Sequence, residues 1–319
     1  MNFLDLVDKT KFTIWRYAGL YPEIKPKYRL TLGEGWTGEA EVEGIVFKKE
    51  FDNPTGSIKD RGMAYQMSAV YQEGIKEAII PSSGNGAIAA AAYGSLAGIK
   101  ITAFVSKNIL PGKMMEIRNR GGEVKMCEHP LAEAEEVELS LGVRNLRPST
   151  DEPAACGFMS LSLEIFERLI RRDREIDSIF LPVSSGATLV GVGQGFKALV
   201  DQGFIETSPQ IHAVQTEAVH PVAEEFDGEF RPKARSVAEA ICAKETARGE
   251  EVLRLIKESG GSGWVIGDKE ILAANVWLEA HDLVCSFEGA LALAGLWKAK
   301  KNDWKIKAPL VVLTGKRYR

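Results

Sequence analysis

A lysine at the start of a predicted helix is the residue best placed for covalent chemistry. Lys59 follows a turn at Asn53–Gly56, where Asn before Pro is restricted to extended backbone and Pro and Gly favour turns. Ser57, with Asp60 three residues later, has the spacing of a capping box and predicts that a helix begins here. A cation in a first helical turn opposes the helix dipole, so we expect a lowered pKa for Lys59. A neutral lysine amine can form a Schiff base with a carbonyl compound.

Two loops that follow predicted buried strands carry groups suited to binding anions. The first lies between a strand at 78–81 and a helix of small residues, and the second follows a strand at 178–183. Hydroxyl groups and backbone amides at a helix amino end form a site for a carboxylate or a phosphate. For the first loop, a capped helix packed through its alanines explains the residues equally well. The loops consist of Ser82, Ser83, Gly84, Asn85, Gly86 and Ala87, and of Ser184, Ser185, Gly186, Ala187 and Thr188.

Nucleotide binding is a weaker interpretation of the second loop. Gly191, Gly193 and Gly195 partly match the dinucleotide fingerprint, but they fall inside the predicted helix with the spacing G-x-G-x-G. No G-x-x-x-x-G-K-[ST] motif occurs, so the sequence does not predict a P-loop. The pattern therefore favours a phosphate cup over a nicotinamide site.

Composition narrows the classes of partner. The 319 residues are 45% hydrophobic and 26% charged, as in ordinary soluble globular proteins. The net charge of −4 and the absence of Lys/Arg runs argue against nucleic acid as a partner. The four cysteines lie far apart and the four histidines are scattered, so neither a disulfide framework nor a metal site is predicted. There is no apolar run of about eighteen residues, and we expect a cytoplasmic protein with small-molecule partners and no membrane association.

Predicted strands and helices alternate along most of the chain. Strands are expected near 44–50, 78–81, 100–105, 122–126, 178–183, 211–217 and 310–315, with helices between most of them. This alternation predicts an α/β fold with a parallel sheet. Ligands of such sheets bind beyond the carboxyl ends of the strands, where Lys59, both loops and Thr314 are expected. Residues 218–263 are predicted to be irregular apart from a charged helix at 250–258.

The order of these motifs resembles that of the fold type II pyridoxal-phosphate enzymes, and the closest resemblance is to the threonine synthase family. It rests on Asn-Pro-Thr-Gly-Ser-Ile-Lys-Asp-Arg-Gly at 53–62, Ser-Ser-Gly-Asn at 82–85, the serine and glycine cup, and Leu-Thr-Gly at 313–315. The resemblance implies two open twisted sheets, mostly parallel and flanked by helices, with the cofactor in the cleft between domains. It implies a larger cofactor-binding domain of residues 1–66 plus 155–319, a smaller mobile domain of residues 67–154 that binds the substrate carboxylate, and a homodimer.

The resemblance also assigns roles to single residues. Lys59 would hold pyridoxal 5'-phosphate as a Schiff base and later move protons, and Asn85 would be the partner of the ring hydroxyl. Thr314 would face the pyridine nitrogen, and a neutral hydroxyl there leaves that nitrogen largely unprotonated. The cofactor phosphate is assigned to Ser184, Ser185, Gly186, Ala187 and Thr188, and the substrate carboxylate to Ser82, Ser83, Gly84, Asn85, Gly86 and Ala87.

The sequence departs from threonine synthases where these grip the phosphate of O-phosphohomoserine. The family has an Asn-Ser pair, an arginine and a Glu-Gly, whereas this chain has Pro148, Ser149, Ala154 and Cys156 at the matching positions. Loss of a cation from a phosphate site costs about 2 to 5 kcal/mol of binding. We therefore expect elimination or replacement on an amino acid, with conversion of O-phosphohomoserine to threonine and phosphate as the first hypothesis. A serine or threonine dehydratase or a cysteate synthase-like β-replacement enzyme is the second, and a non-catalytic binding protein is the third.

Overall fold

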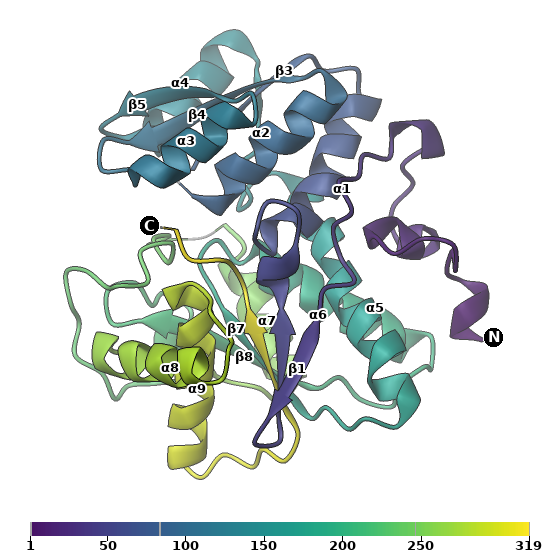
Figure 1. Ribbon diagram of the computed structural model, residues 1–319, viewed down its shortest axis with the longest axis vertical. Helices are drawn as coiled ribbons and strands as arrows, with labels where there is room; N and C mark the ends of the chain where they lie inside the picture. The colour runs from purple at the N-terminus through teal and green to yellow at the C-terminus, as the bar shows by residue number, and fades with distance from the viewer. Residues whose placement is uncertain (1, 83, 246, 319) are drawn as a thin grey trace. The chain divides into compact units, whose positions relative to one another are not determined.

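The computed structural model describes residues 2–82, 84–245 and 247–318, and its strands form two sheets (Figure 1). The larger sheet has the strand order β1-β2-β10-β7-β8-β9, and only β1 runs antiparallel to its neighbour. Its central strands are buried on both faces, which explains their continuous apolar sequences. The strands are β1 (Glu39–Val42), β2 (Ile45–Lys49), β7 (Ser178–Pro182), β8 (Gln210–Thr216), β9 (Gly263–Ile266) and β10 (Pro309–Leu313).

The smaller sheet has the strand order β5-β4-β3-β6 and is parallel throughout. Helix α4 packs on β3 and β4, while α1 and α2 pack against each other. The predicted α/β class with two mostly parallel sheets is therefore confirmed. The elements are β3 (Glu77–Pro81), β4 (Lys100–Ser106), β5 (Glu123–Cys127), β6 (Arg144–Asn145), α1 (Lys59–Gln72), α2 (Asn85–Ala97), α3 (Pro111–Asn119) and α4 (Pro130–Leu141).

The remaining helices accompany the larger sheet. Helix α9 packs against β7, β8, β9 and β10, and α5 packs against α6. The α-helices are α5 (Met159–Arg168), α6 (Ala187–Asp201), α7 (Gly249–Glu258), α8 (Asp268–Ala280) and α9 (Phe287–Lys301). Short 3-10 helices span Phe3–Asp5, Ile14–Leu20, Pro26–Tyr28, Glu50–Asp52, Glu152–Phe158, Ile170–Arg172 and Ala223–Glu225.

The chain divides into two compact units. Unit 1 comprises residues 1–36, 53–157 and 318–319, and unit 2 comprises residues 37–52 and 158–317. This division groups 1–36 and 53–66 with the smaller sheet, whereas the predicted domains grouped them with the larger one. Compactness is a different property from movement as one body, so the smaller mobile domain at 67–154 stays a prediction.

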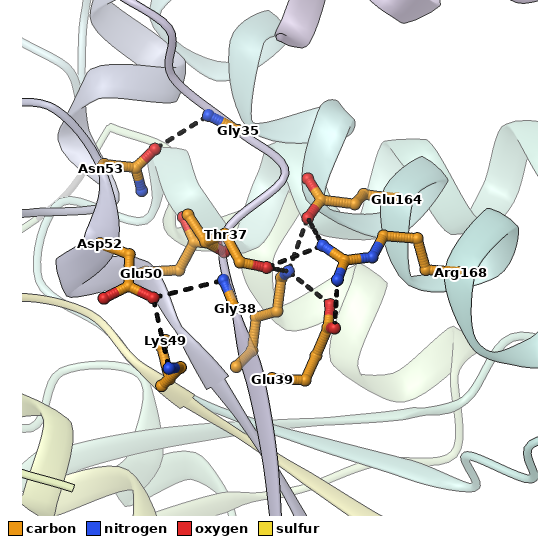
Figure 2. Close-up of polar contacts among 11 residues, drawn as sticks. Gly35, Thr37, Gly38, Glu39, Lys49, Glu50, Asp52, Asn53, Glu164 and Arg168 are labelled. Carbon is orange, nitrogen blue, oxygen red and sulfur yellow. Dashed lines mark hydrogen bonds and ion pairs between the residues drawn. The ribbon is translucent and has the colours of Figure 1, made fainter. Parts of the chain in front are cut away.

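A buried ion network fastens the β1–β2 hairpin to α5 within unit 2. Figure 2 shows Glu164 and Arg168 of α5 reaching toward Glu39 of β1. Lys48 Nζ, on a fully buried side chain, lies 2.7 Å from Glu39 and 2.6 Å from Glu164. The Thr37 carbonyl accepts from both Lys48 and Arg168, at 2.6 and 2.8 Å. Every charge in the network therefore has an opposite charge beside it, which offsets the cost of removing it from water.

Two negative findings limit the kinds of ligand and environment. In the part of the chain that the structure describes, no helix combines the length and apolar character needed to cross a membrane. Over the same residues, no group of three or more His, Cys, Asp or Glu side chains is placed to hold a metal ion.

Candidate active site

Lys59 is the first residue of α1, as the sequence predicts. The turn before it is closed by the Gly56 amide, which donates to the Asn53 carbonyl at 2.7 Å, and Gly56 has a positive φ of 91° that favours glycine. The predicted capping box is wrong. The Asp60 carboxylate accepts from the Thr55 amide and hydroxyl, at 2.7 and 2.8 Å, instead of turning back to Ser57. Asp60 therefore fixes the turn in front of Lys59.

Two buried carboxyl groups accompany this turn in unit 1. Burial raises the pKa of Asp60 to about 7, and the charge of Glu34 adds to the shift. Burial also raises the pKa of Glu34, against the effect of its hydrogen-bond donors. Glu34 Oε2 accepts from Thr31, from the Leu32 amide and from Tyr93, at 3.0, 3.0 and 2.8 Å. These donors are all neutral, so the two carboxyl groups can take up protons near neutral pH.

The loop after β3 presents an unpartnered polar atom. Helix α2 begins at Asn85 and is preceded by Gly84 in an extended conformation. Asn85 Oδ1 is buried, and among the described residues it has no hydrogen-bond partner. A Cβ added to Gly84 would meet nothing within 4 Å, so there is open space beside this loop. A buried acceptor next to open space fits a ligand that donates a hydrogen bond. Ser83, also predicted for this site, lies outside the described residues.

The segment predicted to contact substrate phosphate lies at the same edge of the smaller sheet. β6 runs parallel to β3, and the Leu146 amide extends the pairing by donating to the Ile79 carbonyl at 2.8 Å. The carboxyl ends of both strands therefore meet, which brings the segment of Ser149 to the edge occupied by Ser82 and the α2 amino end. The Gln66 side chain of α1 donates to the Leu146 carbonyl at 3.2 Å and ties the Lys59 helix to the same segment.

Gly157 explains why the glycine of the family's Glu-Gly pair is present here. A Cβ at this position would lie 2.0 Å from the Arg61 carbonyl oxygen, in the first turn of α1. Only glycine permits that approach. The preceding residue, Cys156, is consequently held near the Lys59 turn, where threonine synthases have glutamate, and Ala154 is only 1% exposed. A buried alanine cannot replace the family's arginine as a phosphate ligand.

The loop after β7 forms the second half of the predicted site, within unit 2. Gly186 has a φ of +84° and directly precedes α6, so the chain reverses there in a conformation that favours glycine. Ser184 Oγ accepts from the Cys242 and Ala243 amides at 3.3 and 3.4 Å. The loop is therefore held from outside by a segment far along the chain.

Thr314 lies at the same edge of the larger sheet as this loop. It directly follows β10, which pairs in parallel with β7. The carboxyl ends of parallel neighbours meet at one edge, so the structure brings Thr314 and the Ser184–Thr188 loop together in unit 2. Lys59, the Ser82–Ala87 loop and Ser149 come together separately in unit 1.

The helical glycines of α6 have a packing explanation. A Cβ at Gly195 would lie 2.8 Å from the Met159 carbonyl oxygen in α5, and a Cβ at Gly193 would lie 2.9 Å from Leu255 in α7. Both residues sit within α6 and away from its amino end. These glycines allow close helix packing, which removes the support for a nicotinamide site.

Residues 32–315 match the family model described as "Pyridoxal-phosphate dependent enzyme". The chain belongs to this family. Its cofactor is pyridoxal 5'-phosphate, and the local geometry fits that group: Asn85 offers a free buried acceptor, Gly84 leaves space, and Gly186 shapes a loop of hydroxyls and amides at a helix amino end.

Similar proteins with curated names are threonine synthases of low sequence identity. The chain is 27% identical over 291 residues to the threonine synthase of Methanosarcina acetivorans, covering 82% of this chain and 68% of that protein. It is also 27% identical over 314 residues to the threonine synthase of Halalkalibacterium halodurans, covering 94% of this chain and 87% of the other.

Solved structures with the same fold include enzymes of several activities. Maize serine racemase matches with a TM-score of 0.73 at 20% identity, over 86% of this chain and 84% of the other. A bacterial-type threonine deaminase, from T.th., matches with a TM-score of 0.70 at 22% identity, over 86% and 87%. These likenesses confirm the fold type II architecture.

Proposed function

We propose that this enzyme carries out elimination or replacement on an amino-acid substrate, with threonine synthase as the nearest named activity. The observation that carries the proposal is the placement of Lys59 at the first turn of a helix whose neighbours are the Ser82–Ala87 loop and the segment of Ser149. The threonine synthase relatives, which extend over most of the chain, support the choice of reaction.

Each group of residues has one task in this proposal. Lys59 forms the covalent link and carries the α-proton. Ser82, Ser83 and the amides of Gly84 to Ala87 bind the substrate carboxylate, and Asn85 Oδ1 accepts from the ring hydroxyl of the cofactor. The cofactor phosphate binds at Ser184, Ser185, Gly186, Ala187 and Thr188, and Thr314 faces the pyridine nitrogen. When bound, pyridoxal phosphate supplies an aldehyde that joins amines as Schiff bases and makes the α-proton acidic.

A dehydratase or β-replacement activity on an unphosphorylated substrate is the second candidate. It is favoured by the buried Ala154 and by Cys156, which stand where threonine synthases have the arginine and glutamate of the phosphate grip. Ser149, 6% exposed, remains as a hydroxyl of that grip. Loss of a charged phosphate ligand weakens binding by about 2 to 5 kcal/mol, so a phosphorylated substrate would bind poorly without a replacement.

The covalent role of Lys59 is tested with the Lys59→Ala variant. The wild-type protein is expected to bind the cofactor covalently after borohydride reduction, with the adduct on the peptide containing Lys59. The variant should lose the adduct and at least about a hundredfold of its rate, the lower range for a positioned acid or base. The matched variant Lys76→Ala, at an exposed lysine of unit 1, should behave as wild type. An adduct retained in Lys59→Ala would refute the assignment.

The substrate is tested by comparing two assays on one preparation. Phosphate release from O-phosphohomoserine supports the threonine synthase reaction, and keto-acid formation from serine or threonine supports the dehydratase. Ser149→Ala should lower kcat/KM for O-phosphohomoserine about fivefold or more if that hydroxyl contacts its phosphate, since a hydrogen bond to a charged group contributes about 1.5 to 3 kcal/mol. If neither assay gives product although Lys59 carries the cofactor, the elimination chemistry itself is wrong.

A further inference from the structure

An open cavity of about 480 Å³ lies within unit 2, away from the residues assigned above. A cavity of this size accommodates a small metabolite. It is lined by the end of β8, by the irregular segment that follows, and by the start of α8. The lining residues are Glu217, Arg231, Lys233, Arg235, Gly267, Asp268, Lys269 and Glu270.

The charges around this cavity are unequally neutralised. Four cations face three carboxylates, and within the described part of the chain Arg231, Lys233, Arg235 and Lys269 form no ion pair. Asp268 is already engaged, because its Oδ1 accepts from the Ser236 hydroxyl at 2.6 Å and from the Val237 amide at 3.0 Å. The cavity therefore has an excess of unengaged donors. Guanidinium groups match the oxygens of a phosphate in pairs.

A single segment joins this cavity to the loop assigned to the cofactor phosphate. We call residues 231–243 the strap. Its first part supplies Arg231, Lys233 and Arg235 to the cavity. Its last part supplies the Cys242 and Ala243 amides that donate to Ser184 Oγ.

Between these ends the strap is anchored at three places. The Ser236 hydroxyl and the Val237 amide are bound to Asp268 at the start of α8. Ala238 and Ile241 are buried in the core of unit 2. The Ala240 amide donates to Glu288, in the first turn of α9, at 3.0 Å. A displacement of the cationic end is consequently transmitted to Ser184 through packed residues and hydrogen bonds.

We propose that this cavity is an effector site for a small phosphate-bearing anion, and that its occupation tightens the hold of the Ser184 loop on the cofactor phosphate. The anion draws the cations of the strap together and restricts the segment that positions Ser184. The coupling half of this inference rests on the proposed function; the binding half does not.

Binding is tested by calorimetry with inorganic pyrophosphate on the cofactor-loaded enzyme. We expect one saturable site, and a loss of at least tenfold in affinity in the triple variant Arg231→Ser, Lys233→Ser, Arg235→Ser. A matched triple variant, Arg172→Ser, Lys197→Ser, Arg254→Ser, removes the same charges from exposed positions of unit 2 outside the cavity and should bind within about twofold of wild type. Equal losses in both variants, or no saturable binding to wild type, would overturn the site. Succinate that binds as tightly as pyrophosphate would overturn the phosphate class.

Coupling is tested by the rate at which bound cofactor is lost into a large excess of buffer, followed by its absorbance. Pyrophosphate should slow the loss at least threefold in wild type and leave it unchanged in the cavity triple variant. Ser236→Ala keeps the cations but removes one link between the strap and α8, so it should bind pyrophosphate within about twofold and lose most of the slowing. An unchanged or faster loss in wild type would overturn the coupling.

Failure of the proposed function is distinguishable from failure of this inference. A preparation that holds no cofactor contradicts the proposed function, and the calorimetry then still applies. Pyrophosphate bound in an empty cofactor loop would survive the cavity triple substitution, whereas binding in the cavity would not.

Discussion

Buried charged groups are treated differently in the two units. In unit 2, Lys48 and Glu164 are fully buried and each lies within 2.7 Å of an opposite charge. In unit 1, Glu34 and Asp60 are equally buried, but their hydrogen-bond partners are neutral and their pKa values are raised. Paired charges keep their ionisation over a wide pH range, whereas unpaired acids exchange protons. The difference assigns a fixed framework to unit 2 and a pH-dependent one to the Lys59 side.

Removing one partner of the unit 2 network should have the largest effect on stability. Lys48→Met leaves Glu164 buried beside Glu39 without its nearest cation, and we expect a loss of about 3 to 5 kcal/mol in urea unfolding. Lys197→Met, which breaks an exposed pair with Asp201, should cost less than about 1 kcal/mol. The double variant Lys48→Met, Glu164→Leu should recover most of the loss. A double variant as unstable as the single one would show that Lys48 acts through packing alone.

Asp60 should make unit 1 less stable as pH rises. Its pKa is about 7 in the folded protein and about 3.9 in an unfolded chain, so between these values the unfolded chain releases a proton that the folded chain retains. Stability therefore falls by up to about 1.4 kcal/mol per pH unit from pH 4 to 7. Asp60→Asn should remove this part of the slope in unfolding experiments. Equal slopes in variant and wild type would contradict the unpaired-acid interpretation.

His212 should give unit 2 the opposite dependence. It is buried, stacks on Phe180 at 4.4 Å and accepts from Trp264 Nε1 at 3.2 Å. Burial lowers its pKa to about 3, so below about pH 6.5 the unfolded chain binds a proton that the folded chain does not. Stability falls toward acid pH, by about 2 to 3 kcal/mol between pH 6.5 and 4.5. His212→Gln should flatten this acid limb, with Trp fluorescence as the readout, and an unchanged limb would assign it to other groups.

Gly157 should give the smallest stability effect of the set, but one specific to unit 1. Gly157→Ala places a Cβ against the Arg61 carbonyl oxygen, and the shift needed to relieve the overlap should cost about 1 to 3 kcal/mol. Gly228→Ala adds a Cβ in unit 2 where nothing lies within 4 Å and should change the free energy of unfolding by less than about 0.5 kcal/mol. A neutral Gly157→Ala would mean that the approach of the two segments is adjustable.

Prediction from the sequence succeeded where local rules and motif order were sufficient. Strand and helix alternation, the turn before Lys59, and the start of α1 at Lys59 are local consequences of Pro, Gly and apolar spacing. The same rules failed for Asp60, because the carboxylate that spacing assigns to a cap binds Thr55 instead. Lys48, in the apolar run Ile45–Lys49, gave a signal that was available but unused: a buried strand tolerates a charge only when a partner waits for it.

The sequence by itself determined which chemistry is present: a lysine at a helix start, two anion-binding loops, and the order that places the chain among pyridoxal-phosphate enzymes. Only the tertiary structure decided the charge states around that chemistry. Glu34 depends on Tyr93, 59 residues away, and Lys48 on Glu164, 116 residues away. The pKa of a buried group depends on its desolvation and on the neighbours that folding supplies, and neither is written in the local sequence.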